Sequence, residues 1–222
     1  MHGFGSNKND HVCSEIAKIL KDKGIASIRF DFDGHAESEG SFQNMTIAKE
    51  VQDAKAVYDY VSKLDYVTKI GIQGHSQGGL ICALLAKDKT CKIETMVIMA
   101  PALCVPDDAR AGKNLGVRYD PNHIPEAGIR IGSNILGKKF IEEAQKMHLW
   151  EEIKEYDKPV CILHGSQDPI VPVRYSMRAA EIYPHAKLHV FDGDDHGFSK
   201  NFEAACQEAA DFLATNLKQV EK

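Results

Sequence analysis

The residues with the clearest chemical potential form the stretch Gly74-His75-Ser76-Gln77-Gly78. An apolar segment precedes it and a helix-forming segment follows, so the two glycines permit a sharp strand-to-helix turn. Such a turn lifts the hydroxyl of Ser76 above the sheet and leaves the backbone N–H of Gln77 free to bind an anion. The stretch therefore predicts Ser76 as a nucleophile and Gln77 as an oxyanion donor.

A serine hydroxyl needs a general base, and that base needs a third group that fixes its tautomer. His196 follows the last predicted strand, in "FDGDDHGF", and Asp168 follows the strand before it, in "LHGSQDPIVP". Asp194 and Asp195 are rivals for the orienting role, but they lie too near His196 in sequence to reach its far ring nitrogen. We predict a catalytic triad of Ser76, Asp168 and His196.

Other kinds of site fit these residues poorly. "GHSQGG" lacks the lysine and the following Ser or Thr of a phosphate-binding loop, and "HGFGSN" lacks the third glycine of a dinucleotide fingerprint. The six cysteines form no C-x-x-C pair and no zinc spacing. Paired carboxylates for glycoside cleavage are compatible with the composition, but no constellation points to them. We expect neither a metal nor an organic cofactor.

Alternating strands and helices must position the triad. Apolar runs predict strands over 25–30, 68–74, 94–102, 158–165 and 187–193. Helical periodicity predicts helices over 9–24, 47–61, 78–88, 173–183 and 202–218. Because strands that alternate with helices need crossover connections, the sequence predicts an α/β fold with a mostly parallel sheet covered by helices on both faces.

The stretch between Ala102 and Asp157 interrupts this alternation. It is rich in Asp, Arg, Gly, Asn and Pro and then carries one amphipathic run, "GKKFIEEAQKMHLWEEIKEY". A connection of this length is uncommon unless it is functional. We predict a lid, 104–156, inserted into a core of 1–103 and 157–222; a surface excursion with no ligand role is the alternative.

Composition limits the partners of the chain. Its 222 residues, 43% of them hydrophobic, suit one large domain or two small ones. The net charge of −5 and the lack of a basic run argue against nucleic acid and anionic membranes as partners. No apolar run of membrane-spanning length occurs. The scattered cysteines suggest reduced thiols, which favours the cytoplasm.

With these residues in place, the chain resembles the α/β-hydrolase superfamily and, within it, the bacterial cinnamoyl (feruloyl) esterases. The motifs "HGFGSNKND", "RFDFDGHAESEG", "GHSQGG", "HGSQDPIVP" and "DDHGF" follow the family's order and spacing. The resemblance implies hydrolysis of a small-molecule carboxylic ester, a hydroxycinnamate, through an acyl-enzyme. It also implies that Phe4 donates the second oxyanion N–H and that Asp107 or Asp108 binds a phenolic hydroxyl. Ala36 departs from the family, which usually has a glycine there.

The resemblance further implies a strand ahead of His2-Gly3-Phe4 that the sequence lacks. In the family this third strand lies inside the sheet, between the strands predicted at 25–30 and 68–74. Its removal would leave two rows of unpaired backbone groups, each costing about 1–3 kcal/mol. We therefore expect that N-terminal strands are missing, with Met1 an internal methionine or the sequence a fragment. A rearranged sheet, in which the two neighbouring strands pair directly, is the alternative.

Three other functions remain open at this point. The same fold serves lipase-like acylglycerol hydrolases and peptidases, and the lid contacts that separate them cannot be read from the sequence. From a different class, a truncated and inactive hydrolase could bind an aromatic ester without cleaving it. The sequence also leaves a homodimer open.

Overall fold

A parallel β-sheet forms the centre of the protein. The computed structural model describes residues 1–218. Four strands lie in the order β1 (Ile70–His75), β2 (Ile93–Met99), β7 (Val160–Gly165) and β8 (Ala186–Phe191), and all neighbouring pairs are parallel. Every residue of β7 is buried, as are six of the seven in β2. These two strands are the covered centre of the sheet, which confirms the predicted parallel architecture.

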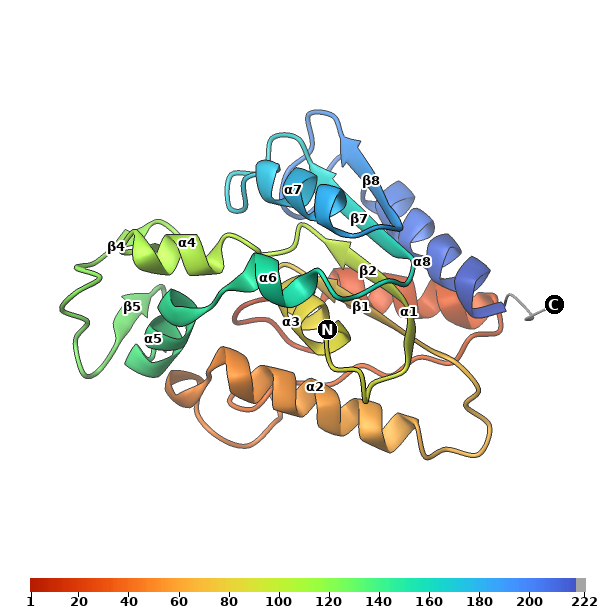
Figure 1. Cartoon of the computed structure of the whole chain (residues 1–222), viewed down its shortest axis with the longest axis horizontal. Helices are drawn as coiled ribbons and strands as arrows, with labels where there is room; N and C mark the ends of the chain where they lie inside the picture. Colours follow the sequence, from red (N-terminus) through yellow and green to blue (C-terminus); the bar gives the residue numbers. More distant parts are fainter. Residues whose placement is uncertain (219–222) are drawn as a thin grey trace.

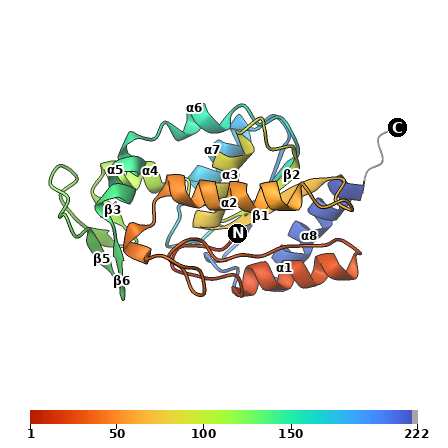
Figure 2. The same cartoon turned by 90° about the horizontal axis from the view of Figure 1, so that it is seen from below.

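Helices cover both faces of the sheet (Figure 1). Helices α1 (His11–Asp22) and α8 (Phe202–Lys218) pack against each other on one face. Figure 2 shows this pair below the sheet and helices α2 and α3 above it. The second face carries α2 (Ile47–Val61), α3 (Gln77–Ala86) and α7 (Arg174–Ile182). The layered α/β arrangement expected from the sequence is therefore present.

Capping side chains fix where two of these helices begin. Asp10 precedes α1, and its carboxylate accepts a hydrogen bond from the backbone N–H of Cys13. Thr46 precedes α2, and its hydroxyl oxygen accepts one from the backbone N–H of Lys49. Each cap satisfies one of the first N–H groups, which have no partner within the helix. The start of α2 therefore lies where the sequence predicts it.

The predicted strand at 25–30 was wrong. These residues form no strand, and the side chain of Ile28 is 51% exposed. A β-strand exists only when a neighbouring strand accepts and donates its backbone hydrogen bonds, and residues 25–30 have no such neighbour in the described chain. The place beside β1 is taken by Met1, whose amino group donates to Gln73 O and whose carbonyl accepts from His75 N.

Most of the segment 104–156 lies at one end of the molecule, drawn in green, and its last helix leads back over the middle (Figure 1). The predicted amphipathic run is split at Met147 and His148 into two helices, because these residues leave helical geometry. Sequence patterns had not indicated the first helix or the two short hairpins of the segment. Its elements are α4 (Val105–Arg110), β3 (Lys113–Asn114), β4 (Val117–Arg118), β5 (Ile129–Ile131), β6 (Asn134–Leu136), α5 (Lys138–Lys146) and α6 (Leu149–Ile153). The division into core and lid stays a prediction.

Within residues 1–218, no helix combines the length and the apolar character needed to cross a membrane. The same residues contain no cluster of His, Cys, Asp or Glu side chains with the geometry of a metal site.

Candidate active site

Ser76 lies at the turn between β1 and α3. Its backbone has φ 55° and ψ −119°, a strained conformation for a residue other than glycine. The turn is held by two hydrogen bonds, from Ser76 N to Met99 O and from Ala102 N to Ser76 O. Because the chain reverses so sharply, strand and helix nearly touch: a Cβ on Gly74 would lie 2.1 Å from Gly78 O. The sharp turn predicted from the two glycines is therefore present.

This close approach predicts that Gly74→Ala destabilises the fold. The added methyl group would collide with backbone, which cannot rotate away as a side chain can, so we expect a loss of about 3 kcal/mol. Gly197→Ala is the matched control, since its Cβ would meet nothing nearer than Asp195 Oδ1 at 3.8 Å. Urea denaturation of both variants tests this. Equal urea midpoints for the two variants would contradict the close approach of Gly74 to the backbone of Gly78.

Asp168 and His196 are hydrogen-bonded to each other, as the sequence analysis expected. His196 Nδ1 lies 2.6 Å from Asp168 Oδ2, and the Asp168 side chain is completely buried. The backbone N–H groups of Ile170 and Val171 donate to the other carboxylate oxygen, at 2.8 and 2.9 Å. The turn after β7 therefore aims a fixed carboxylate at one ring nitrogen of His196.

His164, which the sequence analysis missed, gives Asp168 a further partner. Its Nε2 lies 2.9 Å from Val171 O and 3.1 Å from Asp168 Oδ2, and its Nδ1 lies 2.7 Å from Ser176 Oγ. Because both oxygens facing Nε2 are acceptors, Nε2 carries the hydrogen. As the penultimate residue of a fully buried strand, His164 had no sequence signal that separated it from the core.

The environment of Asp168 favours its charged form. Burial by itself raises the pKa of this carboxyl group. The hydrogen bonds from His164 and His196, the nearby His196 ring and the Val171 N–H outweigh that effect and hold the pKa of Asp168 well below its usual value. Asp168 is therefore an anion throughout the neutral range, as a residue that orients a histidine must be.

His75 ties the loop that carries His196 to the serine turn. Its Nε2 donates to His196 O at 2.9 Å, and the centroids of the His75 and His196 rings are 4.9 Å apart. Burial, aided by the His196 ring, lowers the pKa of His75 to about 4. His75 is therefore neutral at neutral pH. Within the described chain no hydrogen bond joins Ser76 Oγ to His196, and such contacts are often long in free enzymes.

The first residues of the chain lie directly against Ser76. A Cβ on Gly3 would be 3.1 Å from Ser76 Cβ and 3.7 Å from Ser76 Oγ. His2 links the first residues of the chain to the segment at Phe32. Its Nδ1 donates to Gly3 O, and its Nε2 accepts a hydrogen bond from Phe32 N. Among the described residues, the backbone N–H groups of Phe4 and Gln77 have no acceptor. Both predicted oxyanion donors are thus free to bind a ligand oxygen.

The two rivals for the orienting acid brace the loop instead. Asp194 is fully buried and accepts hydrogen bonds from the backbone N–H groups of Asp195, Lys200 and Asn201. Asp195 accepts from Gly197 N and from Ser199. Among residues 1–218, no hydrogen bond or ion pair joins either aspartate to the His196 ring. These hydrogen bonds stabilise the tight loop that follows β8 and carries His196.

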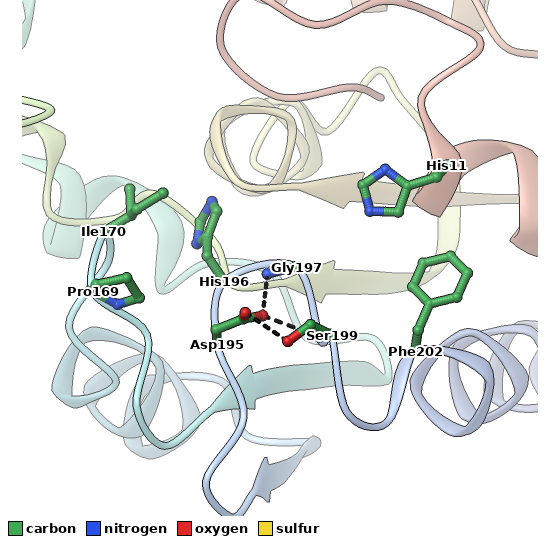
Figure 3. Close-up of a pocket in the computed structure, with 8 residues that line it drawn as sticks. All are labelled: His11, Pro169, Ile170, Asp195, His196, Gly197, Ser199 and Phe202. Carbon is green, nitrogen blue, oxygen red and sulfur yellow. Dashed lines mark hydrogen bonds between the residues drawn. The ribbon is translucent and has the colours of Figure 1, made fainter.

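A cavity of about 450 Å³ opens beside His196 (Figure 3). The close-up shows the His196 ring on one side of it and the rings of His11 and Phe202 on the other, at the starts of α1 and α8. Asp195, Gly197 and Ser199 also line the cavity, and Asp195 accepts hydrogen bonds from the other two. The catalytic histidine candidate is therefore accessible from outside.

A second cavity, of about 260 Å³, lies in the segment 104–156 and is lined by Asp107 and Trp150. Asp107 Oδ2 accepts a hydrogen bond from the Tyr175 hydroxyl at 3.0 Å, and the Trp150 and Tyr175 rings are stacked 6.2 Å apart. Asp108 does not line this cavity and pairs with Lys113 at 2.9 Å. Of the two predicted substrate-binding aspartates, Asp107 lines this cavity and Asp108 does not.

Comparison with known proteins decides the family. A profile of the hydrolase family described as "Serine aminopeptidase, S33" matches residues 1–146, about two thirds of the chain. The chain belongs to this family of α/β hydrolases. Its sheet order and strand-turn-helix serine fit the α/β-hydrolase fold, which confirms the membership expected from the sequence motifs.

One solved structure is similar over almost the whole α/β-hydrolase chain. It is Est1E from Butyrivibrio proteoclasticus with bound ferulic acid, which is 32% identical, with a TM-score of 0.94; the match covers 99% of this chain and 88% of Est1E.

Two curated relatives are more distant. Human protein ABHD12B is 25% identical over 195 residues, which are 84% of this chain and 49% of the relative. The bovine mitochondrial palmitoyl-protein thioesterase ABHD10 is 27% identical over 189 residues, or 81% and 59% of the two chains. The chain therefore spans about half of the first relative's length and about three fifths of the second's.

Proposed function

We propose that this α/β hydrolase cleaves carboxylic esters through an acyl-enzyme, with Ser76, His196 and Asp168 as its triad. The observation that carries the proposal is the 2.6 Å contact between His196 Nδ1 and buried Asp168, next to a serine held in a strained turn. Asp168 occupies Nδ1, so Nε2 is the nitrogen available to take a proton. This arrangement fits acyl transfer and needs no cofactor.

The residues act in the following order. His196 Nε2 accepts the Ser76 proton as Oγ attacks the ester carbonyl carbon, and Asp168 stabilises the resulting imidazolium. The N–H groups of Gln77 and Phe4 bind the oxyanion, and the N-terminus of α3 adds the positive end of its dipole. His196 then protonates the departing alcohol. Water attacks the acyl-enzyme by the same steps and releases the acid.

Hydroxycinnamate esters are the substrate class that we propose. Est1E, which matches 99% of this chain, binds ferulic acid. In the present chain Asp107 lies beside the stacked Trp150 and Tyr175 rings at the second cavity. An aromatic acyl group can stack on such rings, and a phenolic hydroxyl can donate to a carboxylate that already has other partners, because its two oxygens offer about four acceptor positions.

A comparison of four esters tests the function and the substrate class together. We expect kcat/KM for methyl ferulate to exceed that for methyl cinnamate by about tenfold, which corresponds to about 1.4 kcal/mol for one hydrogen bond to the phenolic group. p-Nitrophenyl butyrate should be cleaved, whereas p-nitrophenyl palmitate should be a poor substrate.

Each result that differs from these expectations would favour a different function. Preference for the palmitoyl ester would favour a lipase-like or acyl-thioesterase function, such as that named for bovine ABHD10. Hydrolysis of an aminoacyl amide alone would favour a peptidase. Quenching of Trp150 fluorescence by ferulate esters without any hydrolysis would leave an inactive binding protein.

A further inference from the structure

A buried acid lies behind the oxyanion side of the site. Glu50 sits on α2 with only 2% of its surface exposed. Its Oε2 accepts a hydrogen bond from Gln77 Nε2 at 2.5 Å, and the same Gln77 nitrogen lies 3.5 Å from Met45 Sδ. Gln77 is itself buried and is the first residue of α3. The side chain of the oxyanion donor is therefore anchored to one carboxyl group on the neighbouring helix.

Among the described residues no ion pair involves Glu50. Its side-chain hydrogen-bond partner there is the neutral Gln77 amide, and the charged group that acts on its pKa is another acid, Asp53, on the same helix. A buried carboxylate without a cationic partner is costly, so the neutral acid is favoured. Burial, with a smaller contribution from Asp53, raises the pKa of Glu50 to about 8.

We propose that Glu50 is a positioning residue for the oxyanion hole: its carboxyl group holds the Gln77 side chain, and its ionisation places a negative charge behind the hole that weakens ester hydrolysis at alkaline pH. This inference rests on the proposed function. The hydrogen bond from Gln77 favours ionised Glu50, so the contact survives ionisation. The physical reason for the loss of activity is the negative charge of ionised Glu50, which lies behind the site where the oxyanion forms and opposes the charge that develops there.

Other charged groups near α2 stay the same when Glu50 is changed. Asp53 accepts from Asp33 N, Lys49 pairs with Asp33, and Glu143 of α5 accepts from Ala48 N. The amino group of Met1 donates to Gln73 O on β1, beside α3. An alkaline effect that arises from any of these groups would persist in a Glu50→Gln variant.

The first experiment is the pH dependence of kcat for p-nitrophenyl butyrate from pH 6.5 to 9.5. We expect wild-type kcat to fall about tenfold with one proton-dependent midpoint near pH 8. Glu50→Gln, whose amide oxygen can still accept from Gln77, should show no such decline. Glu50→Ala removes the acceptor and should be less active at every pH. Asp59→Asn, at an exposed position of the same helix, is the matched control and should follow the wild type.

The second experiment does not depend on activity. The backbone amide resonance of Gln77, followed by ¹⁵N NMR over the same pH range, should shift with a midpoint near pH 8 in the wild type and not in Glu50→Gln. Near-ultraviolet circular dichroism verifies that the protein stays folded. A flat wild-type rate profile, or a Gln77 shift that persists in Glu50→Gln, would overturn the inference. If no ester is cleaved at any pH, the proposed function fails, while the Gln77 titration still decides whether Glu50 governs this residue.

Thermal stability supplies an independent readout of the same group. The unfolded chain ionises Glu50 near 4.5, whereas the folded protein keeps the proton up to about 8. The stability contributed by neutral Glu50 is therefore fully present below pH 4.5 and is lost as the pH rises through 8. At pH 8, Glu50→Gln should have a Tm at least about 5 °C above that of the wild type, and at pH 4.5 the difference should vanish.

Discussion

Replacement of Ser76 by alanine is expected to lower kcat for every ester by a factor on the order of 10⁴ to 10⁶, because the acyl-enzyme cannot form without the hydroxyl. Binding should change far less, since the Gln77 and Phe4 N–H groups and the second cavity are untouched. Stability should also be nearly unchanged. The Ser76 hydroxyl makes no hydrogen bond in the described chain, and alanine meets the same positive φ of 55° as serine.

Three measurements check this expectation. Steady-state hydrolysis gives kcat, circular dichroism gives Tm, and mass spectrometry shows whether a fluorophosphonate forms a covalent adduct. The adduct should appear on the wild type and be absent from Ser76→Ala, while Tm should differ by less than about 3 °C. Ser62→Ala, at an exposed position after α2, is the control. Retained turnover or adduct formation in Ser76→Ala would remove Ser76 from the mechanism.

The sequence predicted the residues of this site better than their supports. Ser76, Asp168 and His196 each follow a strand of the parallel sheet, and the carboxyl ends of parallel strands meet at one edge, so their convergence could be inferred from strand order alone. His164 and Glu50 could not be found in this way. Each lies among residues of its element that are buried for packing, and only the folded structure shows that the polar atoms of His164 face Asp168 and those of Glu50 face Gln77.

Two parts of the fold escaped the sequence for different reasons. The run at 25–30 has strand propensity, yet its hydrogen-bond partners would have to come from another segment, and none is present in the described chain. The hairpin β5–β6 in the segment 104–156 joins strands of three residues each, which are too short to show a periodic pattern. Helix α2 was predicted well because its apolar periodicity and its Thr46 cap are local.

Asp168→Asn should be the most informative change among the supports of His196. Asparagine can still accept from the Ile170 and Val171 N–H groups through its oxygen. Its NH₂ group then faces the nitrogens of His164 and His196, at the place where the carboxylate accepted from both. Because two donors cannot bond to each other, His196 must shift its hydrogen to Nε2 or rotate away. In the shifted tautomer Nε2 can no longer take the Ser76 proton, so kcat should fall about 10⁴-fold.

Stability measurements separate this effect from unfolding. Loss of the buried acceptor should cost about 1–3 kcal/mol at pH 7. Since the pKa of Asp168 is lowered in the folded protein, its contribution is present above the ordinary value of 3.8 and is lost as the pH falls towards the folded value. The stability gap between wild type and Asp168→Asn should therefore narrow in acid. Asp192→Asn, near the protein surface, is the control. If Asp168→Asn stays folded and keeps wild-type kcat, another group must orient His196, and the triad proposed here is wrong.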